Sequence, residues 1–300
     1  MIKDIETVNK YCETNDIEKR LLLGKRKPIV ILKQKVNFSL PKNIAPFQNT
    51  LGVMLPYSPL HMLLFSKDID VLIMTSANVH GLPLEYKNEN AKEKLYGLVD
   101  YFLFHNRDIY IPIDDSVTKV IDEEERIIRR ARGYVPEAIK LDHINDILAC
   151  GSNMKNTFCI AKDNYAFLSQ HNGDLENIET LEHYKNNIEH FKNIFSFSPK
   201  YLALDMHPEY LTNQYANNIK LPKIFVQHHH AHIVSCMVEN EEKGQVIGIA
   251  FDGTGYGIDK KIWGGEFLLC SKSQFERVGH LDYIKMVGGE KAIEEPWRMG

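Results

Sequence analysis

Four histidines within five residues make the segment of this sequence best suited to chemistry. The stretch VQHHHAHIVSCM occupies residues 226–237. If it forms a helix, His228 and His232 are four residues apart on one face, where both imidazoles can reach the same ion. His229 and His230 then point elsewhere, either to line a pocket or to orient the ligands. A polar helix start with incidental histidines is the alternative, but the density of one residue type favours a metal or catalytic site.

A carboxylate that can extend this site follows the next apolar run. The segment AFDGTGYG (250–257) places Asp252 directly before glycines. Two histidines need a further ligand, and a set of two imidazoles and a carboxylate admits zinc or iron. Gly253 and Gly255 permit positive φ and close backbone approach, so their N–H groups are expected to cradle a phosphate. Taken alone, the segment also fits a glycine-rich hairpin with an aspartate in its turn.

Residues suited to phosphate oxygens also occur in the first half of the chain. The loop TSANVHG (75–81) follows an apolar run. The hydroxyl groups of Thr75 and Ser76 suit a phosphate, and Asn78 is expected to hold the backbone turn. An ordinary loop between a strand and a helix is the alternative.

Basic side chains supply further candidate phosphate contacts. Arg129 and Arg130 stand side by side in RRARGYVP (129–136), and arginine offers forked donors that match phosphate oxygens. Lys155, in the small-residue turn GSNMKN (151–156), is a similar but weaker candidate. Runs of charge are more often solvated faces. Because the two phosphate-type sites fall in different halves, we expect two reactions on one chain, with an intermediate passed between them.

Strand-like and helix-like runs alternate, which predicts a mixed α/β fold. The pattern restarts after Pro136, so a domain boundary is expected near 138–147. Beyond it, three hairpin strands, two βα units and a strand with a glycine-rich turn match the plan of an actin/Hsp70-like domain. Strands are predicted at 28–33, 101–106, 116–121, 147–151, 157–163, 165–170, 201–205 and 222–227, and the segment 71–78 is predicted as a strand that runs into a polar loop. Helices are predicted at 3–16, 61–65, 179–195, 209–219 and 227–240.

Composition excludes several classes of protein. The chain has 300 residues, 44% of them hydrophobic, with a formal net charge of −4, which argues against general nucleic-acid binding. Its five cysteines form no C-x-x-C pair, which argues against a four-cysteine zinc module and fits a reducing cytoplasm. No apolar run approaches the ~18 residues of a membrane helix.

Together these motifs resemble the HypF family of hydrogenase-maturation carbamoyltransferases. TSANVHGLPL, DDSVTKV and IRRARGYVPEAI resemble the second part of its YrdC-like domain. GSNMKNTFCIAKDNYAFLSQHNGDLENIET, VQHHHAHIVSCM and AFDGTGYG resemble its threonylcarbamoyl-transferase-like domain, which has the actin-like fold. The resemblance predicts residues 1–140 as the C-terminal part of a YrdC-like domain. Residues 141–300 are predicted as the N-terminal part of the carbamoyltransferase domain, truncated at Gly300.

The resemblance implies a reaction sequence in the cytoplasm. Family members hydrolyse carbamoyl phosphate in an acylphosphatase domain, and the YrdC-like domain condenses the carbamate with ATP, bound with Mg, to carbamoyl-adenylate. The last domain, with a metal and a nucleotide, transfers the carbamoyl group to the C-terminal cysteine of the partner HypE. The matching positions are His228 and His232 (metal histidines), Asp252 (an aspartate beside them) and Ser76, Asn78, Arg129 and Arg130 (nucleotide and phosphate motifs).

The sequence also departs from the family pattern. The acylphosphatase domain, the four-cysteine zinc modules and the front of the YrdC-like domain are not among the 300 residues, and a later metal-site aspartate is expected beyond Gly300. An incomplete piece of the enzyme is therefore expected, with no single residue assigned to catalysis. Two alternatives stay open: a protein of tRNA threonylcarbamoyladenosine synthesis, and a non-catalytic remnant that binds a partner. The histidine cluster and the DGTGYG turn favour the hydrogenase branch.

Overall fold

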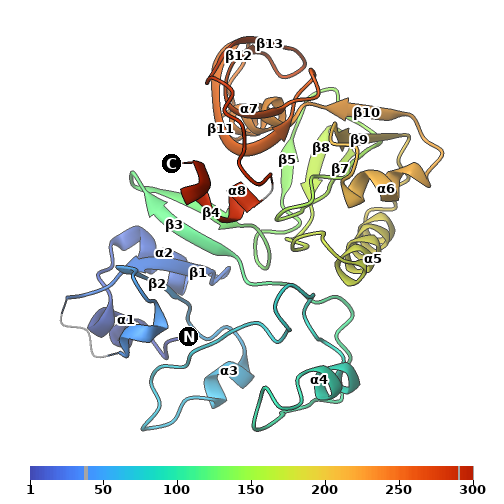
Figure 1. Ribbon diagram of the computed structural model, residues 1–300. Helices are drawn as coiled ribbons and strands as arrows, with labels where there is room; N and C mark the ends of the chain where they lie inside the picture. The colour runs from blue at the N-terminus through green and yellow to red at the C-terminus, as the bar shows by residue number, and fades with distance from the viewer. Residues whose placement is uncertain (37–39, 290, 300) are drawn as a thin grey trace. The chain divides into compact units, whose positions relative to one another are not determined.

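The computed structural model describes residues 1–36, 40–289 and 291–299 (Figure 1). Packing divides the chain into two compact units. Unit 1 comprises Met1–Ile147 and Asn153–Pro199, and unit 2 comprises Leu148–Ser152 and Lys200–Gly300. Both units mix helices with strands, as the sequence predicts. The domain limits predicted from sequence, 1–140 and 141–300, follow motifs rather than packing and stay a prediction.

A four-stranded sheet forms the first core of unit 1. Its strand order is β2-β1-β3-β4, with β1 parallel to β3 and the other pairs antiparallel. Two short helices bury apolar side chains against it, and Asn15 starts the second with a reciprocal capping box. The elements are α1 (Ile5–Tyr11), α2 (Asp16–Leu23), β1 (Ile29–Lys33), β2 (Thr50–Val53), β3 (Val117–Ile121) and β4 (Glu124–Arg129).

The chain between β2 and β3 has little regular structure. It contains the short helices α3 (Pro59–Leu63) and α4 (Asn88–Lys94). The strands predicted at 71–78 and 101–106 are wrong: only Val71 makes an isolated bridge, and residues 101–105 form no strand. Ile73 and Leu103 are each 74% exposed. Apolar composition alone does not make a strand, because a strand also needs a neighbour to pair with and a surface to pack on.

Three further antiparallel strands of unit 1 accompany a long helix. β7 (Cys159–Lys162) and β8 (Tyr165–Leu168) form a hairpin, and β5 (Ala138–Lys140) pairs with β8. The two turn residues of the hairpin, Asp163 and Asn164, both have positive φ, as a two-residue hairpin turn requires. Helix α5 (Ile178–Ile194) starts at the N-cap Asn177 and packs Tyr184 and Phe191 edge-on against Phe158.

Unit 2 begins with strands that carry polar residues at their ends. β9 (Tyr201–Asp205) and β10 (Lys223–Val226) are parallel, and α6 (Leu211–Asn217) connects them. β6 (Ile147–Ala149) precedes Cys150, whose N–H donates to the carbonyl oxygen of Ala203 on β9. Helix α7 (His228–Glu239) starts two residues after β10 ends. The ends of β9 and β10 and the start of α7 therefore meet in one place.

The other half of unit 2 is an antiparallel sheet in the order β11-β12-β13, formed by β11 (Val246–Tyr256), β12 (Ile262–Cys270) and β13 (Phe275–His280). Helix α7 lies inside the curve of this sheet (Figure 1) and buries Ile233 and Met237 against Trp263 and Leu268. Alternate residues of β11 point to the other face. Ile247, Ile249 and Phe251 are 73%, 59% and 68% exposed.

Three short elements complete the described chain: η1 (Lys42–Ile44), α8 (Lys291–Glu294) and η2 (Pro296–Met299). Among the residues that the structure describes, no helix combines the length and the apolar composition needed to cross a membrane.

Candidate metal centre and phosphate pocket

The histidine segment forms the helix that its sequence predicts. Gln227 is the N-cap of α7, and its side-chain oxygen accepts from the N–H of His230 at 2.9 Å. His228 and His232 therefore occupy successive turns of one face, and their Nε2 atoms are 3.2 Å apart. The two imidazoles thus lie next to each other, as the helical spacing predicts.

A bulge in β11 brings Asp252 to the same place. Phe251 pairs with Gly265 and Gly255 pairs with Trp263, so β11 has two more residues than β12 over this interval. Bulges re-aim side chains and are frequent beside functional sites. Oδ2 of Asp252 lies 3.0 Å from Nε2 of His228 and 3.5 Å from Nε2 of His232.

The three side chains fit a small divalent ion. Their donor atoms all lie within 4.8 Å of one another. Zinc binds imidazole and carboxylate ligands at about 2.0–2.2 Å, so tetrahedral ligands are about 3.3 Å apart, close to the spacing seen here. The side chains of His232 and Asp252 are 59% and 32% exposed, so this centre opens toward solvent on one side. Zinc and iron both suit such a donor set.

Asp205 is a residue of this centre that sequence reasoning missed. It ends β9, and its Oδ2 lies 2.7 Å from Nδ1 of His228. The hydrogen bond to Asp205, with the charges of Asp205 and Asp252, raises the pKa of His228 above its ordinary value although burial opposes this. The only sequence signal was an aspartate at the end of the apolar run YLALD.

The other two histidines lie away from the candidate ion position, as predicted. His229 is fully buried, and its Nδ1 lies 3.3 Å from the amide nitrogen of Gln227, which donates to it. Burial lowers the pKa of His229 and keeps it neutral. His230 donates from Nε2 to the carbonyl oxygen of Ser271 at 2.8 Å. Both therefore anchor α7.

Gly253 and Gly255 do not use the positive φ that their lack of a side chain permits. Neither has positive φ, because both belong to β11. The N–H of Gly253 already donates to Oδ1 of Asp252 at 2.7 Å. A Cβ at Gly255 would lie 2.4 Å from Cε1 of His229. The close approach of the His229 imidazole therefore leaves room only for a glycine at this position.

Unit 1 contains a polar pocket of about 400 Å³ that gathers part of the predicted phosphate set. Ser76, Asn78 and Arg129 all line it. The side-chain amide of Asn78 donates to the carbonyl oxygen of Leu82 at 2.9 Å, so Asn78 holds the loop turn as predicted. Asn177, the N-cap of α5, donates from its amide to the carbonyl oxygen of Gly81 and fixes the other side of this loop.

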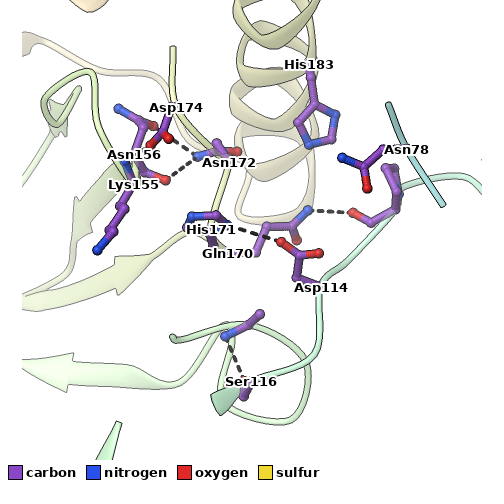
Figure 2. Close-up of polar contacts among 12 residues, drawn as sticks. Asn78, Asp114, Ser116, Lys155, Asn156, Gln170, His171, Asn172, Asp174 and His183 are labelled. Atoms are coloured by element: carbon purple, nitrogen blue, oxygen red, sulfur yellow. Dashed lines mark hydrogen bonds and ion pairs between the residues drawn. The ribbon is translucent and has the colours of Figure 1, made fainter. Parts of the chain in front are cut away.

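Histidines that sequence reasoning did not select also line the pocket (Figure 2). Nδ1 of His171 lies 3.1 Å from Oδ2 of Asp114. Burial tends to raise the pKa of Asp114, but the bond to His171 and the charge of Arg129 bring it below the ordinary value. His183 projects from α5 and lies 3.0 Å from the amide nitrogen of Asn187, and burial lowers its pKa. Arg129 and the Asp114–His171 pair thus offer opposite charges to a ligand.

The remaining phosphate candidates lie outside the lining of this pocket, as far as the described residues show. Thr75 is exposed, and Arg130 offers only its backbone oxygen, to the N–H of His171. The N–H of Lys155 donates to Oδ1 of Asp174 at 2.6 Å, so this residue shapes a turn. Arg129 and Arg130 diverge because alternate residues at the end of strand β4 face opposite sides.

Three family models match the chain. Residues 1–131 match the model described as telomere recombination (Sua5/YciO/YrdC), and residues 142–239 match the HypF Kae1-like domain. Residues 248–300 match the second subdomain of the Kae1-like carbamoyltransferase domain. Every candidate residue discussed above falls within these matches.

Similar proteins match along the whole chain. The carbamoyltransferase HypF of Synechocystis sp. is 41% identical over 100% of this chain and 39% of its own length. The probable carbamoyltransferase HypF of Methanocaldococcus jannaschii is 38% identical over 100% of this chain and 40% of its own length. A crystal structure of full-length HypF in a phosphate- and nucleotide-bound form superposes with a TM-score of 0.95 at 50% identity, over 99% of this chain and 48% of that one. The HypF of T. kodakarensis superposes with a TM-score of 0.93 at 41% identity, over 99% of this chain and 40% of that one.

Proposed function

We propose a function for this chain on the premise that it belongs to the HypF family of carbamoyltransferases, since its relatives match it from end to end at 37–41% identity. The resemblance read from its motifs is confirmed, as is the mixed α/β fold with YrdC-like and Kae1-like parts. The chain spans about two fifths of the length of these relatives. What the whole protein does is therefore a proposal for this chain.

The proposed activity is that of a carbamoyltransferase in NiFe hydrogenase maturation. Carbamate derived from carbamoyl phosphate condenses with ATP to carbamoyl-adenylate, and the carbamoyl group passes to the C-terminal cysteine of a HypE-type partner. We assign this chain to part of both steps. The cysteines that the structure describes form no disulfide, which suits the cytoplasmic location proposed for this chain. A role in tRNA threonylcarbamoyladenosine synthesis is not favoured, because the relatives named above are HypF proteins.

The convergence of His228, His232 and Asp252 is the observation that carries the proposal. These residues would hold a divalent ion, zinc or iron, which supplies Lewis-acid polarisation of a bound oxygen. Their own contribution is to hold three donor atoms within 4.8 Å before any ion arrives, one on each of two helical turns and one on a strand. The exposed side, formed by His232 and Asp252, leaves room for a substrate oxygen.

The pocket of unit 1 is the proposed nucleotide site. Arg129, at the end of β4, offers forked donors to a phosphate, Ser76 offers a hydroxyl, and Asn78 holds the loop that carries Ser76. Asp114 and Asp174 also line the pocket, so a bare anion is disfavoured there. A nucleotide whose phosphates are partly neutralised by Mg suits this mixture of charges better. Thr75, Arg130, Lys155, Gly253 and Gly255 are not proposed as its contacts.

Metal analysis of the purified chain tests the proposal. The chain and single-alanine variants would be loaded with zinc or, without oxygen, with ferrous iron, and the bound metal counted by mass spectrometry. We expect one ion per wild-type chain and almost none after His228→Ala, His232→Ala or Asp252→Ala. His280→Ala, a change at an exposed histidine of unit 2, is the matched control and should keep the ion. Equal partial losses in all four variants would contradict this centre.

A further inference from the structure

The carboxylate of Asp205 is held on two sides. Its Oδ2 lies 2.7 Å from Nδ1 of His228, and its Oδ1 accepts from the N–H of His207 at 2.8 Å. The side chain is only 8% exposed. Asn213 on α6 donates its side-chain amide to the carbonyl oxygens of both Asp205 and His207, which fixes the loop after β9. The carboxylate is thus positioned by its own unit, with no contribution from a ligand.

This contact decides which nitrogen of His228 carries the proton. An ionised carboxylate only accepts hydrogen bonds, so Nδ1 must be the N–H donor. The carboxylate of Asp252 lies 3.0 Å from Nε2, but Asp205 makes the shorter contact, 2.7 Å, and is the less exposed of the two side chains, 8% against 32%. A neutral imidazole therefore keeps its proton on Nδ1 and has its lone pair on Nε2. Nε2 is the atom that lies 3.0 Å from Oδ2 of Asp252 and 3.2 Å from Nε2 of His232. Asp205 lies on the opposite edge of the ring and therefore does not share an ion with these atoms.

His232 differs from His228 in this respect. Its side chain is 59% exposed, against 14% for His228. Within the described part of the chain, the recorded contacts of its ring nitrogens all go through Nε2, to His228 and Asp252. Nothing comparable to Asp205 therefore selects its protonated nitrogen. The two histidines of the centre are unequal: one is held by a buried carboxylate, and the other is largely exposed.

We propose that Asp205 is a positioning residue that holds His228 with its proton on Nδ1 and its lone pair on Nε2, aimed at the ion position. The role given to Asp205 rests on the proposed metal centre, whereas the contact between Asp205 and His228 is present in the structure without any ion. Carboxylates that orient a metal-binding imidazole commonly contribute ten- to hundredfold in metal affinity. An ion pair that only stabilises the fold would change unfolding without changing the state of the ring.

Nitrogen NMR of the metal-free 300-residue chain tests the first half of the proposal. At alkaline pH, where imidazoles are neutral, the ¹⁵N shifts of His228 report which nitrogen carries the proton. We expect the Nδ1–H form to dominate in the wild type and a mixture with the Nε2–H form in Asp205→Ala. Asp205→Asn keeps the shape and should give an intermediate result, which covers the case that the alanine variant does not fold. Asp282→Asn, at an exposed aspartate of the same unit, is the control.

Zinc affinity, measured by competition with a chromophoric chelator, tests the second half. We expect Asp205→Asn and Asp205→Ala to bind zinc ten- to hundredfold more weakly than the wild type, and Asp282→Asn to bind unchanged. Unchanged ring protonation and unchanged affinity in folded Asp205 variants would overturn the proposal. A wild-type chain with His228 protonated on Nδ1 that binds no zinc would instead contradict the metal centre and leave the role of Asp205 in holding the ring intact.

Discussion

Gly248 controls the distance between the two halves of the metal centre. It lies on β11 directly under α7, and a Cβ added there would lie 2.2 Å from Cδ1 of Ile233 and 2.7 Å from both of its γ-carbons. Ile233 cannot turn aside, because a β-branched side chain in a helix has essentially one rotamer. Gly248→Ala must therefore push β11 away from α7. Forcing a methyl into such a packed contact costs about 1–3 kcal/mol.

The displacement also reaches the candidate metal site, since Asp252 is four residues farther along the same strand and His228 and His232 are on the helix. Urea unfolding of the metal-free chain measures the loss of stability, and chelator competition measures zinc affinity. We expect Gly248→Ala to lower both the stability and the zinc affinity. The affinity should fall about tenfold for each 1.4 kcal/mol that ion binding must supply to bring Asp252 back toward the two histidines. Gly253→Ala is the matched control on β11, because a Cβ there meets nothing within 4 Å.

A double-mutant cycle decides whether the clash is the cause. Ile233→Ala alone should cost about 2–5 kcal/mol, because it removes a buried side chain. In that background Gly248→Ala should cost nothing or restore some stability, since its methyl enters the vacated space. The two changes would then be coupled by more than 1 kcal/mol. If Gly248→Ala costs the same in both backgrounds, within about 0.5 kcal/mol, the reasoning from this contact is wrong.

Three further results are expected. Arg129→Ala should weaken ATP binding in calorimetry while Arg130→Ala leaves it nearly unchanged, because only Arg129 lines the pocket; equal effects would contradict this placement of the nucleotide. Burial lowers the pKa of His183, so its share of stability is complete above pH 6.5 and is lost as pH falls through the lowered value; urea unfolding of His183→Gln should show less of this acid sensitivity than the wild type. Arg277→Met should cost about 3–5 kcal/mol in urea unfolding, because it leaves the carboxylate of Glu266, a side chain only 2% exposed, without its 2.6 Å partner; a loss below 1 kcal/mol would argue against a buried pair.

The metal residues on α7 could be predicted because their relationship is local. The helical period alone places His228 and His232 on one face, and Gln227 at the cap fixes where the helix begins. Asp252 could be selected from the sequence because it follows an apolar run, although the bulge that directs its side chain could not be predicted. Asp205 could not be inferred, since it lies 23 residues from His228 and meets it only through the parallel pairing of β9 with β10.

Other misses have different physical causes. Sequence shows that a glycine can adopt positive φ but not that it does, so the glycines of β11 were assigned to phosphate when one of them makes room for His229. Runs such as 71–78 and 101–106 have the composition of strands, yet pairing depends on neighbours that are remote in sequence. The pocket wall of His171 and His183 was missed for a similar reason, because its members face Arg129 only after the chain folds.

The strand that delivers Asp252 also has a consequence for how the protein behaves in concentrated solution. β11 lies at one edge of its sheet, and its first six residues, VIGIAF, carry no charge and no proline. Edge strands of natural proteins are usually kept short or protected by lysine or proline, because unpaired backbone groups template the addition of further strands. Uncharged segments of six or seven residues with high β-propensity are also those that stack into fibrils. Aggregation of this chain should therefore begin at β11, and a lysine in place of the outward-facing Ile249 would block that stacking without touching the side that faces α7.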